Sequence, residues 1–403
     1  MGMLEENPKA KSDACLACTA CITTCPITAA TQEFRGPKLI GPAQGRLHFA
    51  EDDVEPSIDY CSNCKNCDIS CPSGISVSTL NMLQRGAYYK KHRHPLRDNM
   101  LAHSERMMKL ARKMPLGVFF ANLGMEIGSK SGMLKAIGIA GKRTMPKFAS
   151  QSFLQRFRKL KQTAYPDKVV FFPGCYINDN APQVGMAFVE VMQQNHYEVI
   201  VDEKFVCCGS PLVVTGYLDE AKENARKNTE RLRFWREQKY PVITCCTSCS
   251  LMLKQEYEEL FGQEEMHKNG ENIFDSFEFL WNLKEKGQLD TNLKPLAKSY
   301  IYHAPCHLRV QGIGLPALEL MALIPDLSVE NADAGCCGIS GNYGLKEDKY
   351  EISMKVGQEL FKRIEDSSSE AVLSDCGTCR MQIEHGTTKK AFHPMELLAA
   401  AYR

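Results

Sequence analysis

The sequence has little that would place the protein within a membrane or outside the cell. No window reaches the 18 or so uninterrupted apolar residues that a membrane-spanning helix needs, and the most apolar stretch, residues 116–140, is broken by Glu126, Lys130 and Lys135. The chain opens with the polar run MGMLEENPKAKSDA, so we expect no secretory signal. A disulfide framework is therefore a weak explanation for the cysteines.

The chain also has almost no net charge and no recognisable catalytic motif. The 403 residues include 49 Lys or Arg and 48 Asp or Glu, a balance that alone predicts no anionic partner. We find no phosphate loop, no pair of acids and no nucleophile triad whose placement argues for substrate chemistry. We therefore predict no catalytic residue, and no nucleic-acid partner because no recognised binding motif is present.

Cysteine is what the chain has in abundance. There are nineteen, and all but Cys245 fall into four ordered groups. The first two groups share the spacing C-x2-C-x2-C-x3-C-P and consist of Cys15, Cys18, Cys21 and Cys25 before Pro26, and Cys61, Cys64, Cys67 and Cys71 before Pro72.

That spacing is typical of bacterial ferredoxins, in which the fourth cysteine of each run binds the cluster held by the other run. It predicts one 4Fe-4S cluster on Cys15, Cys18, Cys21 and Cys71, and a second on Cys61, Cys64, Cys67 and Cys25. A pair of structural zinc sites is the alternative. Tetrahedral zinc, however, gives no reason for a third cysteine at the same interval or for the following proline.

The second half of the chain is a duplication. Its first copy contains Cys175, Cys207, Cys208, Cys246 and Cys249, and its second copy contains Cys306, Cys336, Cys337, Cys376 and Cys379. Equivalent cysteines are 129 to 131 residues apart, which indicates a repeated domain of about that length.

Each copy alternates apolar runs with helical patterns in the order βαβαβ, which predicts a parallel sheet. Cysteines would then gather at the carboxyl ends of strands, where helix N-termini favour thiolates. We expect Gly209 and Gly338, which follow the paired cysteines, to adopt positive φ or to let the backbone pass close to a ligand.

Five thiolates per copy exceed what a cubane cluster or a zinc ion requires. An unusual cluster, a redox-active cysteine site and a structural zinc site all remain open at this point. Cys245 is expected to be a spare buried thiol. His303 and His307 flank Cys306 and would hydrogen-bond a cluster sulfur, carry a proton, or simply pack beside the site.

Positive charge is concentrated between Arg85 and Lys161, where 18 Lys or Arg residues accompany only three acids. Apolar residues are interleaved with them, so this segment predicts helices that lie on an anionic membrane surface. Lys109, Arg112, Lys142 and Arg143 are the expected lipid contacts. The alternative is a basic linker that packs on an acidic partner or on the cluster domains.

Together these motifs resemble the iron-sulfur subunits of the group that includes heterodisulfide reductase and glycolate oxidase. Within that group the chain is most similar to the family of iron-sulfur subunits of anaerobic glycerol-3-phosphate dehydrogenases. The resemblance covers essentially the whole chain and includes three stretches outside the cysteine pattern. They are Gly36-Pro37-Lys38 with Gly41-Pro42 and Arg46-Leu47, Tyr60 to Cys67, and Met145-Pro146-Lys147-Phe148.

The resemblance implies an electron-transfer and membrane-anchoring subunit without an active site of its own. It would receive electrons from a flavoprotein subunit that oxidises glycerol 3-phosphate and pass them to membrane quinone, on the cytoplasmic face of the inner membrane. Relatives bind non-cubane 4Fe-4S clusters through all five cysteines of each repeat, which implies two such clusters beside the two cubane ones. The alternatives are a subunit of a glycolate or other 2-hydroxy acid oxidase, and a heterodisulfide-reductase-like catalytic subunit.

The predicted fold class is α + α/β, with four parts. Residues 1–84 form a helical two-cluster ferredoxin-type domain, and residues 85–166 form a basic amphipathic helical linker with possible membrane contact. Residues 167–295 and 296–403 form the two cysteine-rich α/β domains.

Overall fold

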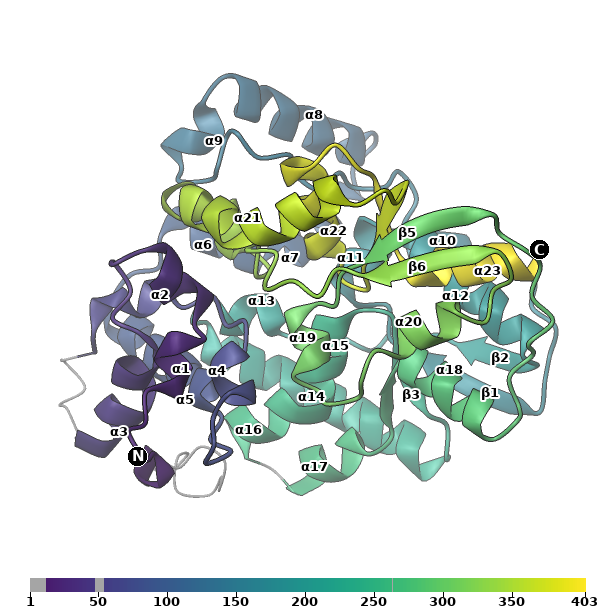
Figure 1. Ribbon diagram of the computed structural model, residues 1–403, viewed down its shortest axis with the longest axis horizontal. Helices are drawn as coiled ribbons and strands as arrows, with labels where there is room; N and C mark the ends of the chain where they lie inside the picture. Colours follow the sequence, from purple (N-terminus) through teal and green to yellow (C-terminus); the bar gives the residue numbers. More distant parts are fainter. Residues whose placement is uncertain (1–11, 48–53, 263) are drawn as a thin grey trace.

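A computed structural model describes residues 12–47, 54–262 and 264–403 (Figure 1). Most of the polar run that argues against a secretory signal therefore lies outside the described residues. The structure combines an N-terminal group of helices with two four-stranded parallel sheets, as the predicted α + α/β class requires.

The N-terminal helices are mostly single turns because the cysteine loops interrupt them. Four of them are short: α1 (Ala20–Thr23), α2 (Pro26–Ala30), α3 (Gln44–Leu47) and α4 (Asn66–Ile69). Pro26 opens α2 at a position where a missing N–H costs no hydrogen bond. The longer helix α5 (Val77–Lys91) follows the second loop and buries most of its first half.

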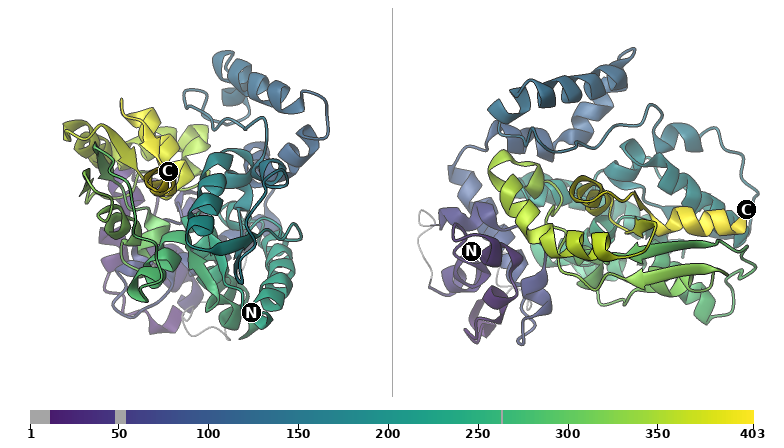
Figure 2. Two further views of the ribbon diagram at one scale, coloured as in Figure 1. Left: turned by 90° about the vertical axis from the view of Figure 1, so that its right-hand side faces the viewer. Right: turned by 45° about the horizontal axis from the view of Figure 1, so that its top comes forward.

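The basic segment folds into five helices, and some of its residues pack against the two repeats. These helices are α6 (Leu96–Ala102), α7 (Ser104–Ala111), α8 (Gly117–Lys130), α9 (Met133–Ala136) and α10 (Phe153–Phe157). In Figure 1, α8 and α9 lie at the edge of the molecule, beyond α21, and both views of Figure 2 show these blue helices at the periphery. No helix of the described residues is long and apolar enough to cross a membrane.

The first repeat is a parallel sheet in the order β2-β1-β3-β4. Its strands are β1 (Asp167–Phe171), β2 (Tyr197–Ile200), β3 (Val242–Thr244) and β4 (Ile273–Asp275). The helices between and after them are α11 (Gly174–Asp179), α12 (Pro182–Gln194), α13 (Ser210–Val213), α14 (Leu218–Glu237), α15 (Thr247–Leu251), α16 (Tyr257–Phe261), α17 (Glu264–Gly270) and α18 (Ser276–Glu285).

The second repeat has the same topology, with sheet order β6-β5-β7-β8. Its strands are β5 (Lys298–Tyr302), β6 (Leu327–Asn331), β7 (Ala371–Leu373) and β8 (Ala391–Phe392). Its helices are α19 (Cys306–Arg309), α20 (Pro316–Met321), α21 (Tyr350–Asp366), α22 (Gly377–Gly386) and α23 (Pro394–Tyr402). The fourth strand of each repeat goes beyond the predicted βαβαβ unit, since two or three residues are too few to show a periodic pattern.

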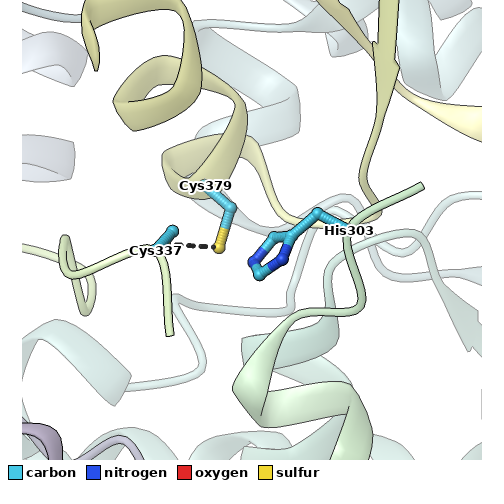
Figure 3. Close-up of side chains that lie close together, drawn as sticks. All are labelled: His303, Cys337 and Cys379. Carbon is cyan, nitrogen blue, oxygen red and sulfur yellow. Dashed lines mark hydrogen bonds between the residues drawn. The ribbon is translucent and has the colours of Figure 1, made fainter. Parts of the chain in front are cut away.

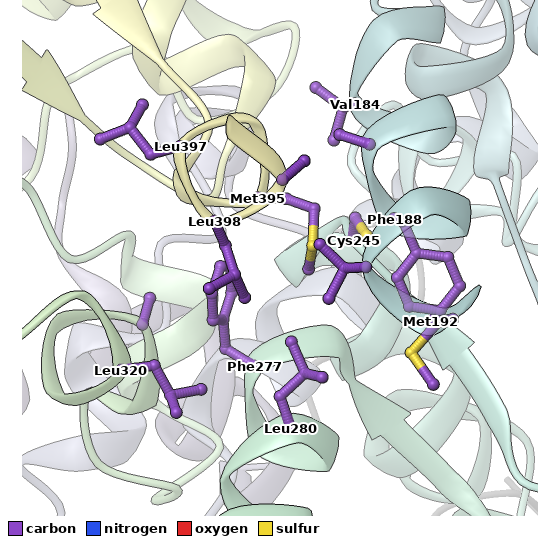
Figure 4. Packing of buried hydrophobic residues seen from close by; sticks show 14 of the residues in the cluster. Val184, Phe188, Met192, Cys245, Phe277, Leu280, Leu320, Met395, Leu397 and Leu398 are labelled. Atoms are coloured by element: carbon purple, nitrogen blue, oxygen red, sulfur yellow. The ribbon is translucent and has the colours of Figure 1, made fainter. Parts of the chain in front are cut away.

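The two repeats share one hydrophobic core, in which α12 of the first packs against α23 of the second. Figure 4 shows Val184, Phe188 and Met192 on α12 on the side of the core toward which Met395 of α23 extends. Cys245 is buried in the same core, and burial raises its thiol pKa well above the usual value, as expected of a spare packed thiol. Packing therefore holds the two repeats to each other as a single body.

Buried ion pairs attach the N-terminal helices to both repeats. Lys65, which is 2% exposed, lies 2.8 Å from the carboxylate of Glu256 in the first repeat. Asp59 lies 3.6 Å from Lys346 and 3.3 Å from Lys349 in the second. Burial alone would raise the pKa of Asp59, but Lys346, Arg85, Lys349 and Arg97 lower it well below its usual range. The cysteine loops are thereby held against both sheets.

Candidate iron-sulfur sites

The two ferredoxin-type loops have the same unusual backbone. Ala17 and Thr19 in the first loop have φ of 55° and 67°, and Asn63 and Lys65 in the second have φ of 54° and 66°. Each non-glycine residue in this left-handed region costs about 1–2 kcal/mol. Both loops have these strained residues at matching positions. The left-handed backbone conformation is therefore a specific feature of the loop, and it directs three cysteine sulfurs toward one point.

The structure brings together the four cysteines predicted for the first cluster. Cys15, Cys18, Cys21 and Cys71 line one small cavity beside Lys38 and Pro42. Cys18 is exposed, whereas Cys21 is buried. This site is therefore close to the protein surface.

The second predicted set is assembled more deeply. Burial, followed by repulsion from the sulfurs of Cys306, Cys25 and Cys61, raises the pKa of Cys64 well above its usual value. Cys61 accepts a hydrogen bond from the side-chain amide of Asn81 at 3.6 Å. Cys25 thus lies beside the second run although it belongs to the first, which is the crossed arrangement that the spacing predicts.

All five cysteines of the first repeat converge at the carboxyl edge of its sheet. The Sγ atoms of Cys208 and Cys249 are 3.5 Å apart. Hydrogen bonds from the thiols of Cys175 and Cys208 lower the pKa of Cys207 well below its usual value. Neighbouring sulfurs that share protons in this way are suited to replace those protons with a metal.

The first-repeat site opens into a cavity of about 100 Å³. Cys175 and Cys207 line it together with Glu105 and Lys109, which come from α7 in the basic segment. Burial and the neighbouring Cys207 raise the pKa of Glu105, although Lys109 is 2.6 Å away. Gly174 has a φ of +61°, and a Cβ there would lie 2.8 Å from the sulfur of Cys249. The glycine therefore gives the sulfurs room.

The second-repeat site has the same sulfur pattern but is buried throughout. The Sγ atoms of Cys337 and Cys379 are 3.2 Å apart, and Cys336 accepts a hydrogen bond from the backbone N–H of Gly338 at 3.3 Å. Arg309 donates to the sulfur of Cys306 at 3.4 Å. A half-buried guanidinium at this distance offsets the negative charge that ligated thiolates bring.

His303 is part of this second site. One ring nitrogen and the sulfurs of Cys337 and Cys379 all lie within 4.8 Å of one another, and Figure 3 shows the ring directed toward the two cysteines. Burial, helped by Arg309, lowers the pKa of His303 to about 4. The sequence pointed to this residue by its proximity to Cys306, but the partners it meets are Cys337 and Cys379.

The glycines after the paired cysteines adopt the predicted positive φ, +90° at Gly209 and +89° at Gly338. Their surroundings differ. A Cβ on Gly338 would lie 2.0 Å from the carbonyl oxygen of Ser353, whereas a Cβ on Gly209 would find its nearest neighbour at 3.6 Å. Gly338 therefore allows a close approach of backbone as well as a special conformation.

The cysteine sites form a row that does not follow the sequence order. Cys64 of the second ferredoxin-type site packs with Cys306 and Cys336 of the second repeat. The second repeat in turn meets the first, because Cys376 lies close enough to Cys246 to affect its pKa. Contacts thus link the Cys15 site to the Cys64 site, the Cys64 site to the second repeat, and the second repeat to the first.

Two side chains form hydrogen bonds between neighbouring cysteine sites, a role that the sequence did not predict for them. Tyr176, next to Cys175, donates a hydrogen bond to the carbonyl of Gly377, next to Cys376, at 3.1 Å. His307 contacts the carbonyl of Asn63 at 3.0 Å and the hydroxyl of Ser248 at 2.9 Å. Its side chain thereby links the second ferredoxin-type loop to the first repeat, a contact that no local pattern could indicate.

These donor sets fit iron-sulfur clusters. Four cysteines gather at each of the first two sites and five at each of the others, and all of them are free thiols. When bound, such clusters supply one-electron transfer. The chain's own residues supply the thiolates, the half-buried cation Arg309 and the low-polarity surroundings that set how readily each site is reduced.

Known protein families match the same regions. A 4Fe-4S dicluster domain matches residues 11–75, and the cysteine-rich domain called CCG matches residues 169–254 and again 300–384. The fold and the cysteine sites thus define an iron-sulfur protein with a two-cluster domain and a duplicated cysteine-rich domain.

Three relatives extend this result over nearly the whole chain. The C subunit of anaerobic glycerol-3-phosphate dehydrogenase from Escherichia coli (strain K12) is 34% identical, over 96% of this chain and 98% of its own. The B subunit of fumarate reductase (CoM/CoB) from Methanothermobacter marburgensis is 28% identical, over 96% of this chain and 72% of its own. A probable glycolate oxidase iron-sulfur subunit from Bacillus subtilis (strain 168) is 25% identical, over 96% and 93%. The chain belongs to the family of anaerobic glycerol-3-phosphate dehydrogenase C subunits.

Proposed function

We propose that the protein passes electrons from a flavoprotein subunit that oxidises glycerol 3-phosphate to membrane quinone, while attached to the cytoplasmic face of the inner membrane. The observation that supports this most directly is the continuous row of four cysteine sites. Cys18 is exposed at one end of the row, and the cavity beside Cys175 and Cys207 opens at the other. A row with two accessible ends suits a protein that receives electrons from one partner and delivers them to another.

The two ends suit different partners. The end at Cys18 lies in the helical domain, and we assign it to the flavoprotein. The other end borders α7, which contributes Glu105 and Lys109 to the cavity and also carries the exposed side chains of Met107 and Leu110. Helix α7 leads directly into α8, so this end of the row is the one near the proposed membrane surface.

Helices α7 to α9 carry the largest group of exposed apolar side chains. Among the residues that the structure describes, nine of the fifteen exposed large hydrophobic ones lie from Met107 to Met133. We call these nine the apolar crest: Met107, Leu110, Met114, Leu116, Phe119, Phe120, Leu123, Ile127 and Met133. Phe119, Phe120, Leu123 and Ile127 share one stripe of α8 at helical spacing, and both phenyl rings are 59% exposed. A helix that turns its apolar stripe to the outside is typical of an interaction surface.

The basic residues near the crest divide into two kinds. Lys130, Lys135 and Lys142 are well exposed and are suited to contact anionic lipid headgroups. The expectation that Arg112 and Arg143 do the same is wrong. Arg112 is paired with Asp179 at 2.8 Å, and Arg143 is 2% exposed and bonded to Gln382 and Ser353. Both guanidinium groups hold the basic segment to the repeats.

Membrane attachment is tested by vesicle flotation of the anaerobically purified full chain. Replacing Phe119 and Phe120 by Glu should reduce binding to anionic vesicles at least tenfold and leave the iron content unchanged, because the crest would no longer enter the headgroup region. The matched control is Phe234→Glu on α14, where the phenyl ring is 42% exposed but lies outside the crest. Equal binding by both variants would refute the crest as the attachment surface.

Partner identity is tested by reconstitution. Together with the flavoprotein subunits of a glycerol-3-phosphate dehydrogenase, the chain should support glycerol-3-phosphate-dependent reduction of a quinone, and without it the flavoprotein should reduce artificial dyes alone. Turnover with glycolate or another 2-hydroxy acid would favour the oxidase alternative that the Bacillus subtilis relative represents. Cleavage of a disulfide substrate by this chain without any flavoprotein would favour a catalytic reductase.

A further inference from the structure

His303 has the position of a metal ligand and an unsatisfied ring nitrogen. The residue is 1% exposed, and its Nε2 has no hydrogen-bond partner among the residues that the structure describes. Buried polar nitrogens in folded proteins almost always have a partner. The ring is directed at Cys337 and Cys379, which belong to two different segments of the second repeat (Figure 3).

The first repeat has a phenyl ring at the equivalent place. The backbone N–H of Phe172 donates to the carbonyl of Ile243 at 2.8 Å, and that of His303 donates to the carbonyl of Leu373 at 2.8 Å. Each of these residues directly follows the central strand of its sheet and precedes the first cysteine of its repeat by three positions. Phe172 packs its ring against Phe205, with centroids 5.2 Å apart. Two sites with identical cysteine patterns therefore differ by one nitrogen donor.

The neighbours of His303 exclude the simpler explanations for a buried imidazole. Its Nε2 makes no hydrogen bond with Asp375, whose carboxylate accepts a hydrogen bond from Tyr302 at 2.6 Å. His393, another buried histidine, contacts the carbonyl of Cys245 at 3.0 Å and accepts a hydrogen bond from the backbone of Met395 at 3.1 Å. His393 is a satisfied structural residue, whereas His303 points at sulfurs.

We propose that His303 binds the metal of the second repeat through Nε2, beside Cys337 and Cys379, so that this site has a mixed sulfur and nitrogen ligand set while the first repeat uses sulfur alone. Imidazole is a common ligand of iron and is uncharged, unlike thiolate. With this imidazole in place of one of the five thiolates, the second-repeat site would carry less negative charge than the first and be easier to reduce, as in other iron-sulfur centres with histidine ligands. The inference requires only that the second repeat holds a metal, and it is independent of the electron donor and the quinone.

The test compares the full chain, purified without oxygen, with natural histidine and with ¹⁵N-histidine. Electron-nuclear double resonance on the signal of the second repeat should show a strongly coupled nitrogen that changes with the label. The wild-type chain is used, so the result does not depend on the folding of a variant. Weak or label-independent coupling would overturn the proposal and leave His303 as a hydrogen-bond donor.

Two variants sharpen the assignment. His303→Phe, which copies the first repeat, should lose the strong nitrogen coupling and shift the reduction potential of that site downward. His307→Gln, which changes the neighbouring histidine that contacts Asn63 and Ser248, should keep the coupling. Should the second repeat contain zinc, X-ray absorption at the zinc edge replaces the resonance measurement: one nitrogen neighbour that is lost in His303→Phe supports the proposal, and an all-sulfur shell overturns it.

Discussion

The two cysteine-rich repeats have one topology and two environments. Both sheets place the strand that precedes the first cysteine at an interior position, and both gather five sulfurs at the carboxyl edge. In the first repeat Cys175, Cys207 and Cys246 are partly exposed, whereas in the second all five cysteines are buried. Both copies thus retain the framework that positions the sulfurs. The elements packed around each copy differ, and they determine whether its cysteines are exposed to solvent or buried.

The two repeats differ in the elements that pack against their cysteine sites. The first repeat faces α7 and an open cavity, and the second faces Cys64 of the helical domain and holds His303 and Arg309 among its sulfurs. We infer that the second repeat is an internal relay and the first an outlet. The following predictions test this asymmetry, beginning with the largest expected effect.

Removing one cysteine from each repeat should stop electron flow at different points. Cys306→Ser and Cys175→Ser should each slow quinone reduction by the reconstituted complex at least a hundredfold. With the flavoprotein as donor, Cys306→Ser should leave the first-repeat site oxidised, because the relay before it is broken. In Cys175→Ser the second-repeat site should still be reduced. Electron paramagnetic resonance after freeze-quenching measures the redox state of the two repeat sites in each variant. Reduction of the first-repeat site in Cys306→Ser would contradict the proposed order of electron transfer.

The matched glycines should respond unequally to alanine. Gly209→Ala should destabilise the protein by about 1–2 kcal/mol, the cost of a left-handed residue with a Cβ. Gly338→Ala should cost about 2–3 kcal/mol more, because its Cβ would overlap the carbonyl oxygen of Ser353. Chemical denaturation under anaerobic conditions measures both changes. Equal losses would show that the two turns are equally tolerant and that the second site is not more tightly enclosed.

The interface between the repeats should make stability depend on pH. Burial and repulsion from Asp375 raise the pKa of Asp275 well above its usual value, and burial helped by Cys376 raises that of Asp375 from 3.8 to about 6. The folded protein therefore holds a proton that the unfolded chain releases near pH 4, so stability should fall by about 1–2 kcal/mol as the pH rises from about 5 to about 7. Denaturation midpoints across this range measure the effect.

Asp375→Asn is the control for this pH dependence. An amide keeps the acceptor for the hydroxyl of Tyr302 but cannot titrate, so the variant should lose most of the slope. A wild-type chain whose stability rises over the same pH range would contradict the raised pKa values.

Much of the local architecture was predictable from spacing. The C-x2-C-x2-C runs predicted the crossed grouping of Cys25 and Cys71 with the opposite loops, because a wound loop can direct only three of its sulfurs to one point. The constant offset between Cys175 and Cys306, and between later cysteines, predicted two repeats with parallel sheets. The short strands β4 and β8 escaped prediction since their two or three residues carry no measurable period.

What the sequence could not show is which distant segments meet. Nothing in the local pattern indicates that Cys64 packs against Cys306, or that Arg143 lies buried against Gln382 rather than on the surface. Both contacts join residues more than 230 positions apart, and they depend on how the domains pack. The basic composition of residues 85–161 was equally compatible with lipid contact and with internal pairing, and the structure shows both buried, paired arginines and exposed lysines in this segment.

The central claim is that four cysteine sites in one row all hold iron. The most direct test is a count of iron, acid-labile sulfide and zinc on the anaerobically purified full chain, read beside its electron paramagnetic resonance spectrum. Four 4Fe-4S clusters predict about sixteen irons and as many sulfides, with separate signals from the helical domain and from the repeats. About eight irons accompanied by zinc would show that the repeats are structural zinc sites and would contradict the row.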